Sequence, residues 1–381
     1  MLEPGGPALS RVDAVIDAAI AEKRVVGAVV LIAYDGKIVH RRAAGLNNRE
    51  ARMPMSAERI FRLSSLTKPI VSAAAMALVE RGRLGLDDSV TKWLPDFRPK
   101  LADGRVPTIT LRQLLTHTSG LGYGFAEGGA DGPYRHAQIS DGLDESTVSL
   151  EKNLRRLASV PLLFEPGTTW NYSLGIDVVG AVLERAADAP LADVVSQRIT
   201  APLGMSDTAF YCREPSRLAL PYLNAQPEPV PMSDPAVVTL LPGTNIRYSP
   251  SRALNPHAFP SGGCGMVGTA EDFMRFLEAL RKGGAPILER RSAQAMMSNQ
   301  IGELTTLLGP GTGFGIGAAI VIDPQAAQTP QSAGTITWGG VYGHNWFVDA
   351  QRRVSVVLLT NTALEGMNGA LPMQLRDAIY S

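Results

Sequence analysis

The sequence has few cysteines and histidines. Its only cysteines, Cys212 and Cys264, lie far apart and form no Cys-x-x-Cys pair, which excludes a disulfide framework and a zinc knuckle. Two free buried thiols are typical of a protein in a reducing compartment. The five histidines have no His-x-x-x-His or other paired spacing, so we expect neither a metal site nor a cofactor.

Net charge and long apolar runs are also missing. Lysine and arginine total 36, as do aspartate and glutamate, so the formal net charge is +0. The chain therefore has no excess of positive charge that would favour binding to nucleic acid or to an anionic membrane surface. No apolar stretch reaches the length of a membrane span, and no cationic segment before an apolar run marks a signal peptide. We therefore expect a cytoplasmic protein without nucleic-acid or membrane partners, and its oligomeric state stays unknown.

Strand patterns lie at both ends of the chain. Near the N-terminus, an amphipathic helix over 9–23 precedes strands at 26–34 and 37–44, which the Asp35-Gly36 turn joins as a hairpin. Near the C-terminus, the pattern predicts strands at 315–322, 335–349 (with a Gly-rich interruption) and 354–360, followed by a helix over 371–380. The hairpin spacing makes the strands antiparallel.

The middle of the chain is mainly helical. Helix patterns occupy 149–159, 173–187 and 189–200, and a further helix opens at Thr269. Two stretches, 125–145 and the proline-rich 221–260, are expected to be long irregular segments over the surface or the site.

These patterns predict an α+β fold. An antiparallel sheet assembled from both chain ends, flanked by helices, would form one discontinuous domain from 1–61 and 262–381. A mainly helical domain, 62–261, would be inserted between them, and we expect the active site in the cleft where the two domains meet.

One Ser-x-x-Lys stretch lies at the junction of the two predicted domains. Ser65 and Lys68 are one turn apart at the start of an apolar helix that belongs in the core. A serine hydroxyl beside a desolvated lysine, whose pKa burial would lower, is suited to be a nucleophile with its base. Pro69 cannot donate to the carbonyl of Ser65, which predicts a loosened or 3₁₀-like first turn.

The same spacing also occurs at Ser89 and Ser149. Ser149 precedes a charged amphipathic helix and is typical of an N-cap, and Ser89 lies in a short segment with an exposed pattern. Only Ser65 opens a buried helix. On this motif alone, an N-cap role for Ser65 stays open beside the catalytic one.

Two further stretches complete a constellation. Trp170-Asn-Tyr-Ser-Leu174 opens a predicted helix, and Trp338-Gly-Gly-Val-Tyr-Gly-His344 lies on a late strand. With Ser65 and Lys68, they resemble the Ser-x-x-Lys, Tyr-x-Asn and Lys-Thr-Gly signature of the serine β-lactamase and penicillin-binding protein superfamily. Within it, the chain is most similar to the family VIII carboxylesterases, which are related to class C β-lactamases. The resemblance spans nearly the whole chain, including 114–121 and 261–266.

The resemblance implies the catalytic roles. Ser65 would be the nucleophile, and Lys68 and Tyr172 would be the base pair, in which phenolate or neutral amine accepts the Ser65 proton. Tyr172 would then pass that proton to the leaving alcohol. The backbone N–H groups of Ser65 and Val341 would form the oxyanion hole.

The resemblance also implies where the substrate lies. It would contact Trp338, Gly339 and Gly340, where the glycines let the backbone approach it closely. His344 either contacts the substrate as well or, more in keeping with its position, supports the strand turn.

Two departures from the β-lactamase pattern indicate the substrate. Leu174 replaces the asparagine of Tyr-x-Asn, and Trp338 replaces the lysine that would bind a substrate carboxylate. We therefore predict a serine carboxylesterase that hydrolyses short- to medium-chain acyl esters through an acyl-enzyme. A β-lactamase or D-alanyl peptidase, an acyltransferase and a non-catalytic penicillin- or acyl-binding protein are the alternatives.

Other motifs carry less weight. Gly263 to Gly268 satisfies G-x-G-x-x-G, but no apolar strand precedes it and no βαβ unit surrounds it, so a dinucleotide site is not predicted. No Gly-x-Ser-x-Gly pentapeptide occurs, so an α/β-hydrolase elbow is not supported. Cys264 has no sequence neighbour that could serve as its base.

Overall fold

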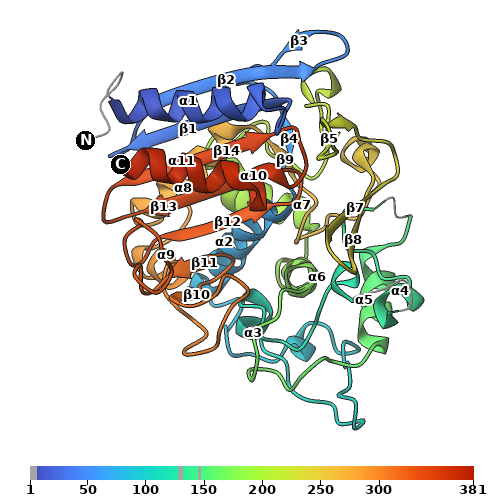
Figure 1. Cartoon of the computed structure of the whole chain (residues 1–381). Coiled ribbons are helices and arrows are strands. Elements are labelled where there is room, and N and C mark those ends of the chain that lie inside the picture. Colours follow the sequence, from blue (N-terminus) through green and yellow to red (C-terminus); the bar gives the residue numbers. More distant parts are fainter. Residues whose placement is uncertain (1–6, 128–131, 145–146) are drawn as a thin grey trace.

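A computed structural model describes residues 7–127, 132–144 and 147–381 of the chain. Its fold is built on one large sheet (Figure 1). The eight strands run in the order β10-β11-β12-β13-β14-β1-β2-β3, and every neighbouring pair is antiparallel. The first strands in the chain are β1 (Gly27–Tyr34), β2 (Lys37–Asn48) and β3 (Met53–Pro54). The last are β10 (Thr312–Phe314), β11 (Ala319–Val321), β12 (Ile336–Gly340), β13 (His344–Asp349) and β14 (Val354–Thr360). Because β1 pairs with β14, both chain ends share one sheet, which confirms the predicted fold class.

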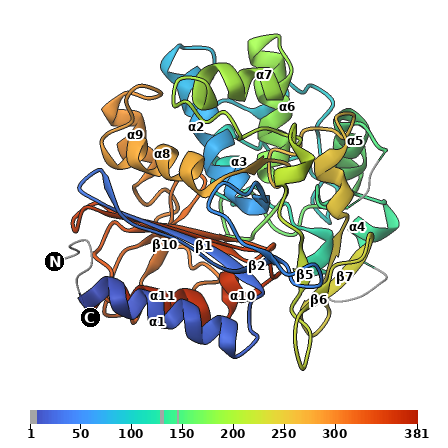
Figure 2. The same cartoon turned by 90° about the horizontal axis from the view of Figure 1, so that it is seen from above.

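Helices cover both faces of the sheet. The first and last helices, α1 (Pro7–Ala21) and α11 (Ala370–Tyr380), lie on one face, and α8 (Ala270–Arg281), α9 (Arg290–Met296) and α2 (Thr67–Glu80) lie on the other (Figure 2). Alternation along β1 produces both layers. Val30 and Ile32 pack in the cluster with α1 and α11, whereas Val29 and Leu31 belong to the larger core on the opposite face.

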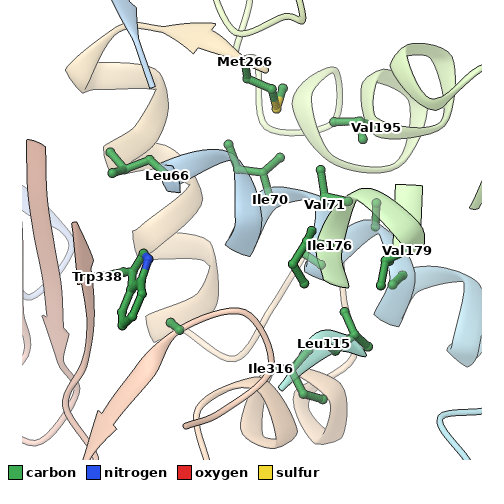
Figure 3. Packing of buried hydrophobic residues seen from close by; sticks show 14 of the residues in the cluster. Leu66, Ile70, Val71, Leu115, Ile176, Val179, Val195, Met266, Ile316 and Trp338 are labelled. Atoms are coloured by element: carbon green, nitrogen blue, oxygen red, sulfur yellow. The ribbon is translucent and has the colours of Figure 1, made fainter. Parts of the chain in front are cut away.

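Helix α2 is buried along most of its length because its side chains are apolar or small. Its residues Ile70 and Val71 lie among side chains of several other elements, which Figure 3 shows: Leu115, Ile176, Val195 and Ile316. A 3₁₀ turn (Ser64–Leu66) precedes the helix, as predicted from Pro69. The buried helix therefore anchors Ser65 at its N-terminal end, between the sheet and the helical part of the molecule.

The helical part of the molecule contains α3 (Leu111–Leu115), α4 (Pro133–His136), α5 (Leu150–Ser159), α6 (Gly175–Ala187) and α7 (Leu191–Val195). Ser149 caps α5 by accepting the Lys152 N–H, which confirms its predicted role. Ser89 likewise caps a 3₁₀ turn (Val90–Lys92) by accepting the Thr91 N–H. Both serines of the other Ser-x-x-Lys stretches are therefore occupied as caps.

The remaining elements are small. Three two-stranded sheets join β4 (Phe61–Arg62) to β9 (Val267–Gly268), β5 (Tyr222–Leu223) to β6 (Val230–Pro231), and β7 (Ala236–Leu241) to β8 (Thr244–Tyr248). A short helix, α10 (Glu365–Asn368), follows β14. The described part of 125–145 is irregular apart from α4 and the end of a 3₁₀ turn (Gly124–Ala126), and 128–131 and 145 lie outside the described residues.

One predicted strand is shorter than expected. The pattern predicted a strand over 315–322, but β11 covers only Ala319–Val321. Gly317 has a φ of +87°, and a Cβ there would lie 2.5 Å from the hydroxyl oxygen of Ser72. The chain therefore bends closely around α2 at this point, a tertiary constraint that the apolar pattern does not encode.

The predicted domain boundaries at 61/62 and 261/262 stay predictions. Among the residues that the structure describes, no helix is both long and apolar enough to cross a membrane.

Candidate active site

The hydroxyl of Ser65 lies at the centre of a buried polar cluster. Ser65 is 5% exposed, and Ser64 before it has a φ of +46°, a strained conformation of the kind found at functional sites. Tyr172 Oη donates to Ser65 Oγ at 2.7 Å, and Lys68 Nζ donates to the same oxygen at 3.3 Å. The structure thus brings together all three residues of the predicted catalytic group.

Lys68 is fully buried, and its ammonium group has defined partners. Nζ donates to the carbonyl of Gly263 at 2.9 Å and lies 4.6 Å from the ring centroid of Tyr172. Burial by itself lowers the pKa of Lys68, but the electrostatic effects of the neighbouring Tyr172, Cys264 and Asp177 together outweigh burial, so the pKa is raised. The expectation of a lowered lysine pKa is therefore wrong, and at neutral pH Lys68 is a cation beside the phenol.

A histidine that the sequence did not single out holds the Tyr172 segment. His117 Nδ1 accepts the backbone N–H of Ser173 at 3.3 Å and lies 3.0 Å from Ser173 Oγ. Its ring centroid is 4.8 Å from that of Tyr172. Burial, with a smaller contribution from Lys68, holds the pKa of His117 well below its usual range. The neutral imidazole therefore acts as an acceptor that fixes the backbone next to Tyr172.

Trp338 closes the other side of Tyr172. Its indole Nε1 donates to Tyr172 Oη at 3.3 Å, and the two ring centroids are 5.2 Å apart. Both residues also belong to or pack against the main core cluster. The tryptophan therefore supplies a neutral donor as well as apolar area at the position where β-lactamases carry a lysine.

The end of β12 packs against the turn that carries Ser65. A Cβ on Gly340 would lie 2.6 Å from Ser64 Oγ, so only glycine permits this approach. Val341 follows directly, and its carbonyl accepts the Tyr248 hydroxyl at 2.9 Å. This contact holds the peptide unit that follows the predicted oxyanion donor, and the Gly340 carbonyl of the donor peptide itself accepts the Gly343 N–H at 2.8 Å. A Cβ on Gly339 would meet Met367 at 2.6 Å instead.

His344 lies on β13 and is buried. Its Nε2 lies 2.9 Å from the carbonyl oxygen of Arg62, and its ring meets that of Phe61 edge-on at 5.8 Å. Burial lowers the pKa of His344 to about 4, so the ring is neutral near pH 7. These contacts favour the supporting role over the substrate contact that the sequence also allowed.

The stretch that matches G-x-G-x-x-G contacts the lysine through the Gly263 carbonyl. Just before this stretch, Ser261 Oγ donates to Asp177 Oδ1 at 2.6 Å. Burial raises the pKa of Asp177 and also raises the pKa of the Cys264 thiol to about 11. Cys264 is thus a protonated, buried thiol. Asp177 was not predicted from the sequence, because its partners come from distant segments of the chain.

This geometry agrees with what known proteins show. The beta-lactamase family matches residues 12–378, and the chain belongs to that family, whose fold it shares. Close relatives of the chain are esterases of this serine hydrolase fold, and the chain is a serine hydrolase of the same kind.

Three relatives illustrate the likeness. The chain is 53% identical to "Esterase EstB" of Burkholderia gladioli over 98% of this chain and 95% of that protein. The solved structure of "EstCE1, a hydrolase with promiscuous acyltransferase activity" has a TM-score of 0.96 and 48% identity, covering 98% of this chain and 99% of that one. A "Lovastatin esterase" of Penicillium rubens is 29% identical over 90% of each chain.

Proposed function

We propose that the protein is a serine carboxylesterase of the family VIII branch, with Ser65 as nucleophile and Lys68 and Tyr172 as its base pair. The observation that carries the proposal is the 2.7 Å contact between Tyr172 Oη and Ser65 Oγ beside the buried amine of Lys68. A hydroxyl, a proton acceptor and a fixed cation at these distances meet the geometric requirements for acyl transfer.

Acylation uses Tyr172 as a phenolate, whose negative charge the Lys68 ammonium group, 4.6 Å from the ring centroid, would balance. Ser65 Oγ attacks the ester carbonyl while the phenolate takes the hydroxyl proton. The negative charge that develops on the carbonyl oxygen is bound by the backbone N–H groups of Ser65 and Val341. The C–O bond of the ester then breaks, and the leaving alkoxide receives the proton from Tyr172. Water repeats the sequence to release the acid.

The preferred substrates are esters of uncharged short- to medium-chain acids. The site presents Trp338 in place of a cationic side chain, and further aromatic rings line the same region, since Tyr123 stacks on Phe125 at 4.6 Å and lies 5.1 Å from Tyr172. Apolar aromatic walls favour acyl chains and give a carboxylate no charged partner. β-Lactam acids are accordingly expected to be poor substrates.

Acyl transfer to an alcohol is the second candidate activity. The structural neighbour at 48% identity is described as a hydrolase with promiscuous acyltransferase activity. An acyl-enzyme on Ser65 could react with an alcohol by the same steps that it follows with water, because Tyr172 accepts a proton from either nucleophile. We further propose a cytoplasmic location, which the two buried free thiols, Cys212 and Cys264, support.

The proposal is tested by hydrolysis of p-nitrophenyl esters of increasing chain length, alongside a chromogenic cephalosporin. Ser65→Ala is expected to abolish ester turnover. Ser89→Ala and Ser149→Ala, which remove the serines of the other two Ser-x-x-Lys stretches, are matched controls that should retain it. A serine-directed phosphonate should label Ser65 in mass spectrometry. Full activity in Ser65→Ala would refute the nucleophile, and faster cephalosporin than ester turnover would reverse the substrate ranking.

A further inference from the structure

A small cavity lies beside Tyr342, the residue after the proposed oxyanion donor. It has a volume of about 20 Å³, which is enough for one water molecule or one monatomic ion. Separate segments of the chain supply its walls, which include Arg62, Ser249, Arg252, Cys264 and Tyr342. Ser65, Lys68 and Tyr172 do not line it, so the cavity is distinct from the proposed catalytic group.

Two arginines line this cavity, and the guanidinium group of each is held by neutral oxygens. Arg62 donates from Nε to the Pro250 carbonyl and from Nη1 to the Ala219 carbonyl, each at 2.9 Å. Arg252 donates to the carbonyls of Asp144 and Phe259, at 3.1 and 2.8 Å. Backbone carbonyls position a guanidinium but leave its charge uncompensated.

Neither arginine forms an ion pair with a carboxylate in the described parts of the chain. The carboxylate that acts on Arg62 electrostatically is Asp234. Its oxygens accept the Ser249 hydroxyl and the Ser251 N–H, both at 2.6 Å. Two carboxylates act electrostatically on Arg252, those of Asp144 and Asp177, and they accept the hydroxyls of Ser140 and Ser261. Burial lowers the pKa of both arginines, as expected for cations whose hydration is only partly replaced.

Tyr342 adds a hydroxyl to the same cavity. Its ring packs edge-on against Tyr248 at 4.9 Å, and the Arg62 guanidinium lies 5.9 Å from its centroid. Burial raises the pKa of Tyr342, so the phenol keeps its proton. Within the described chain, the Tyr342 hydroxyl has no hydrogen-bond partner. The cavity therefore offers N–H and O–H donors together with positive charge, which is the complement of an anion.

We propose that this cavity binds a small monovalent inorganic anion of the chloride class, held between Arg62 and Arg252 with the Tyr342 hydroxyl as a further donor. The free volume matches a single monatomic ion. The bound anion would link three segments that frame the proposed site: β4, which leads into Ser65, the 3₁₀ helix at 250–254 and the turn after Val341. Anion binding does not depend on the reaction at Ser65, and its tests need no ester.

The first test uses the wild-type protein. Crystals grown or soaked in bromide should show an anomalous-difference peak between the two guanidinium groups. In gluconate buffers of constant ionic strength, replacing gluconate by chloride should raise Tm saturably by about 1–3 °C. A water molecule without anomalous signal in the cavity, or a Tm that is equal in gluconate and chloride, would overturn the proposal.

Two variants test whether the chloride-dependent rise in Tm comes from binding in this cavity. Arg252→Met should abolish the chloride-dependent rise in Tm. Arg83→Met is the matched control, because Arg83 also donates to a backbone carbonyl, that of Ala186, but lies outside the cavity. It should keep the rise. A rise of equal size in Arg252→Met would overturn the site, and the wild-type bromide crystals decide the matter if this variant does not fold.

Discussion

The indole N–H of Trp338 donates to the phenol oxygen of Tyr172 at 3.3 Å, and that oxygen lies 2.7 Å from Ser65 Oγ. A neutral donor thus supports the proposed proton acceptor where β-lactamases use a lysine. The arrangement keeps the phenol polarised without placing a second full charge in a region already occupied by Lys68.

Trp338→Phe tests this donor, because it removes the N–H and keeps an aromatic ring at the same position. A hydrogen bond to a group that becomes charged contributes about 1.5–3 kcal/mol, so kcat should fall about 10- to 100-fold while KM changes little. Steady-state kinetics with a p-nitrophenyl ester measure both constants. If KM rises and kcat is unchanged, Trp338 only contacts substrate.

Lys68→Met should lower both activity and stability. Without the cation, Tyr172 is a poor proton acceptor, and we expect kcat to fall at least about 10³-fold. The variant also leaves the buried carbonyl of Gly263 without the amine that donates to it, which costs about 1–3 kcal/mol. Thermal unfolding should therefore show a Tm below that of the wild type. An unchanged Tm would show that the contact between Lys68 and Gly263 contributes nothing to stability.

His117 should be replaceable only by a residue that keeps an acceptor and tolerates its backbone. Its φ is +59°, a conformation that asparagine adopts more readily than leucine. His117→Asn can still accept the Ser173 N–H, so we expect it to retain more of kcat than His117→Leu, which should lose about 10- to 100-fold. Equal losses in both variants would show that ring packing on Tyr172 matters more than the acceptor.

Asp141 should make stability depend on pH. Burial, reinforced by Asp144 and Asp177, raises the pKa of Asp141 to about 7, although its oxygen accepts the Gly124 N–H at 3.0 Å. The folded state thus holds this proton more tightly than the unfolded state does. The contribution of Asp141 to stability is therefore most favourable at acid pH and is lost as pH rises towards 7.

Asp141→Asn removes this penalty while keeping an oxygen that can accept the Gly124 N–H. Relative to the wild type, the variant should be more stable at pH 8, by about 1–3 kcal/mol at most, and the difference should shrink towards pH 4. Urea denaturation at both pH values measures the change. A difference that is independent of pH would show that the carboxyl group is not the cause.

Sequence alone determined the architecture and predicted the nucleophile. The apolar run of α2 makes a buried helix in any compact fold, and Ser65 is the one Ser-x-x-Lys serine that opens such a helix, so composition distinguishes it from the caps at Ser89 and Ser149. Apolar, β-branched runs at both chain ends and the Asp35-Gly36 hairpin turn likewise predict the shared antiparallel sheet, because these signals are local.

Only the tertiary structure decided the charge of Lys68, the support from His117 and the arginine-lined cavity. Each depends on groups from distant parts of the sequence, as when Lys68 meets Tyr172 and the Gly263 carbonyl. Electrostatic effects fall off with distance in space, whereas sequence patterns record only neighbours along one element. Burial predicted a lowered pKa for Lys68, and the folded chain reversed that direction by bringing Tyr172, Cys264 and Asp177 to it.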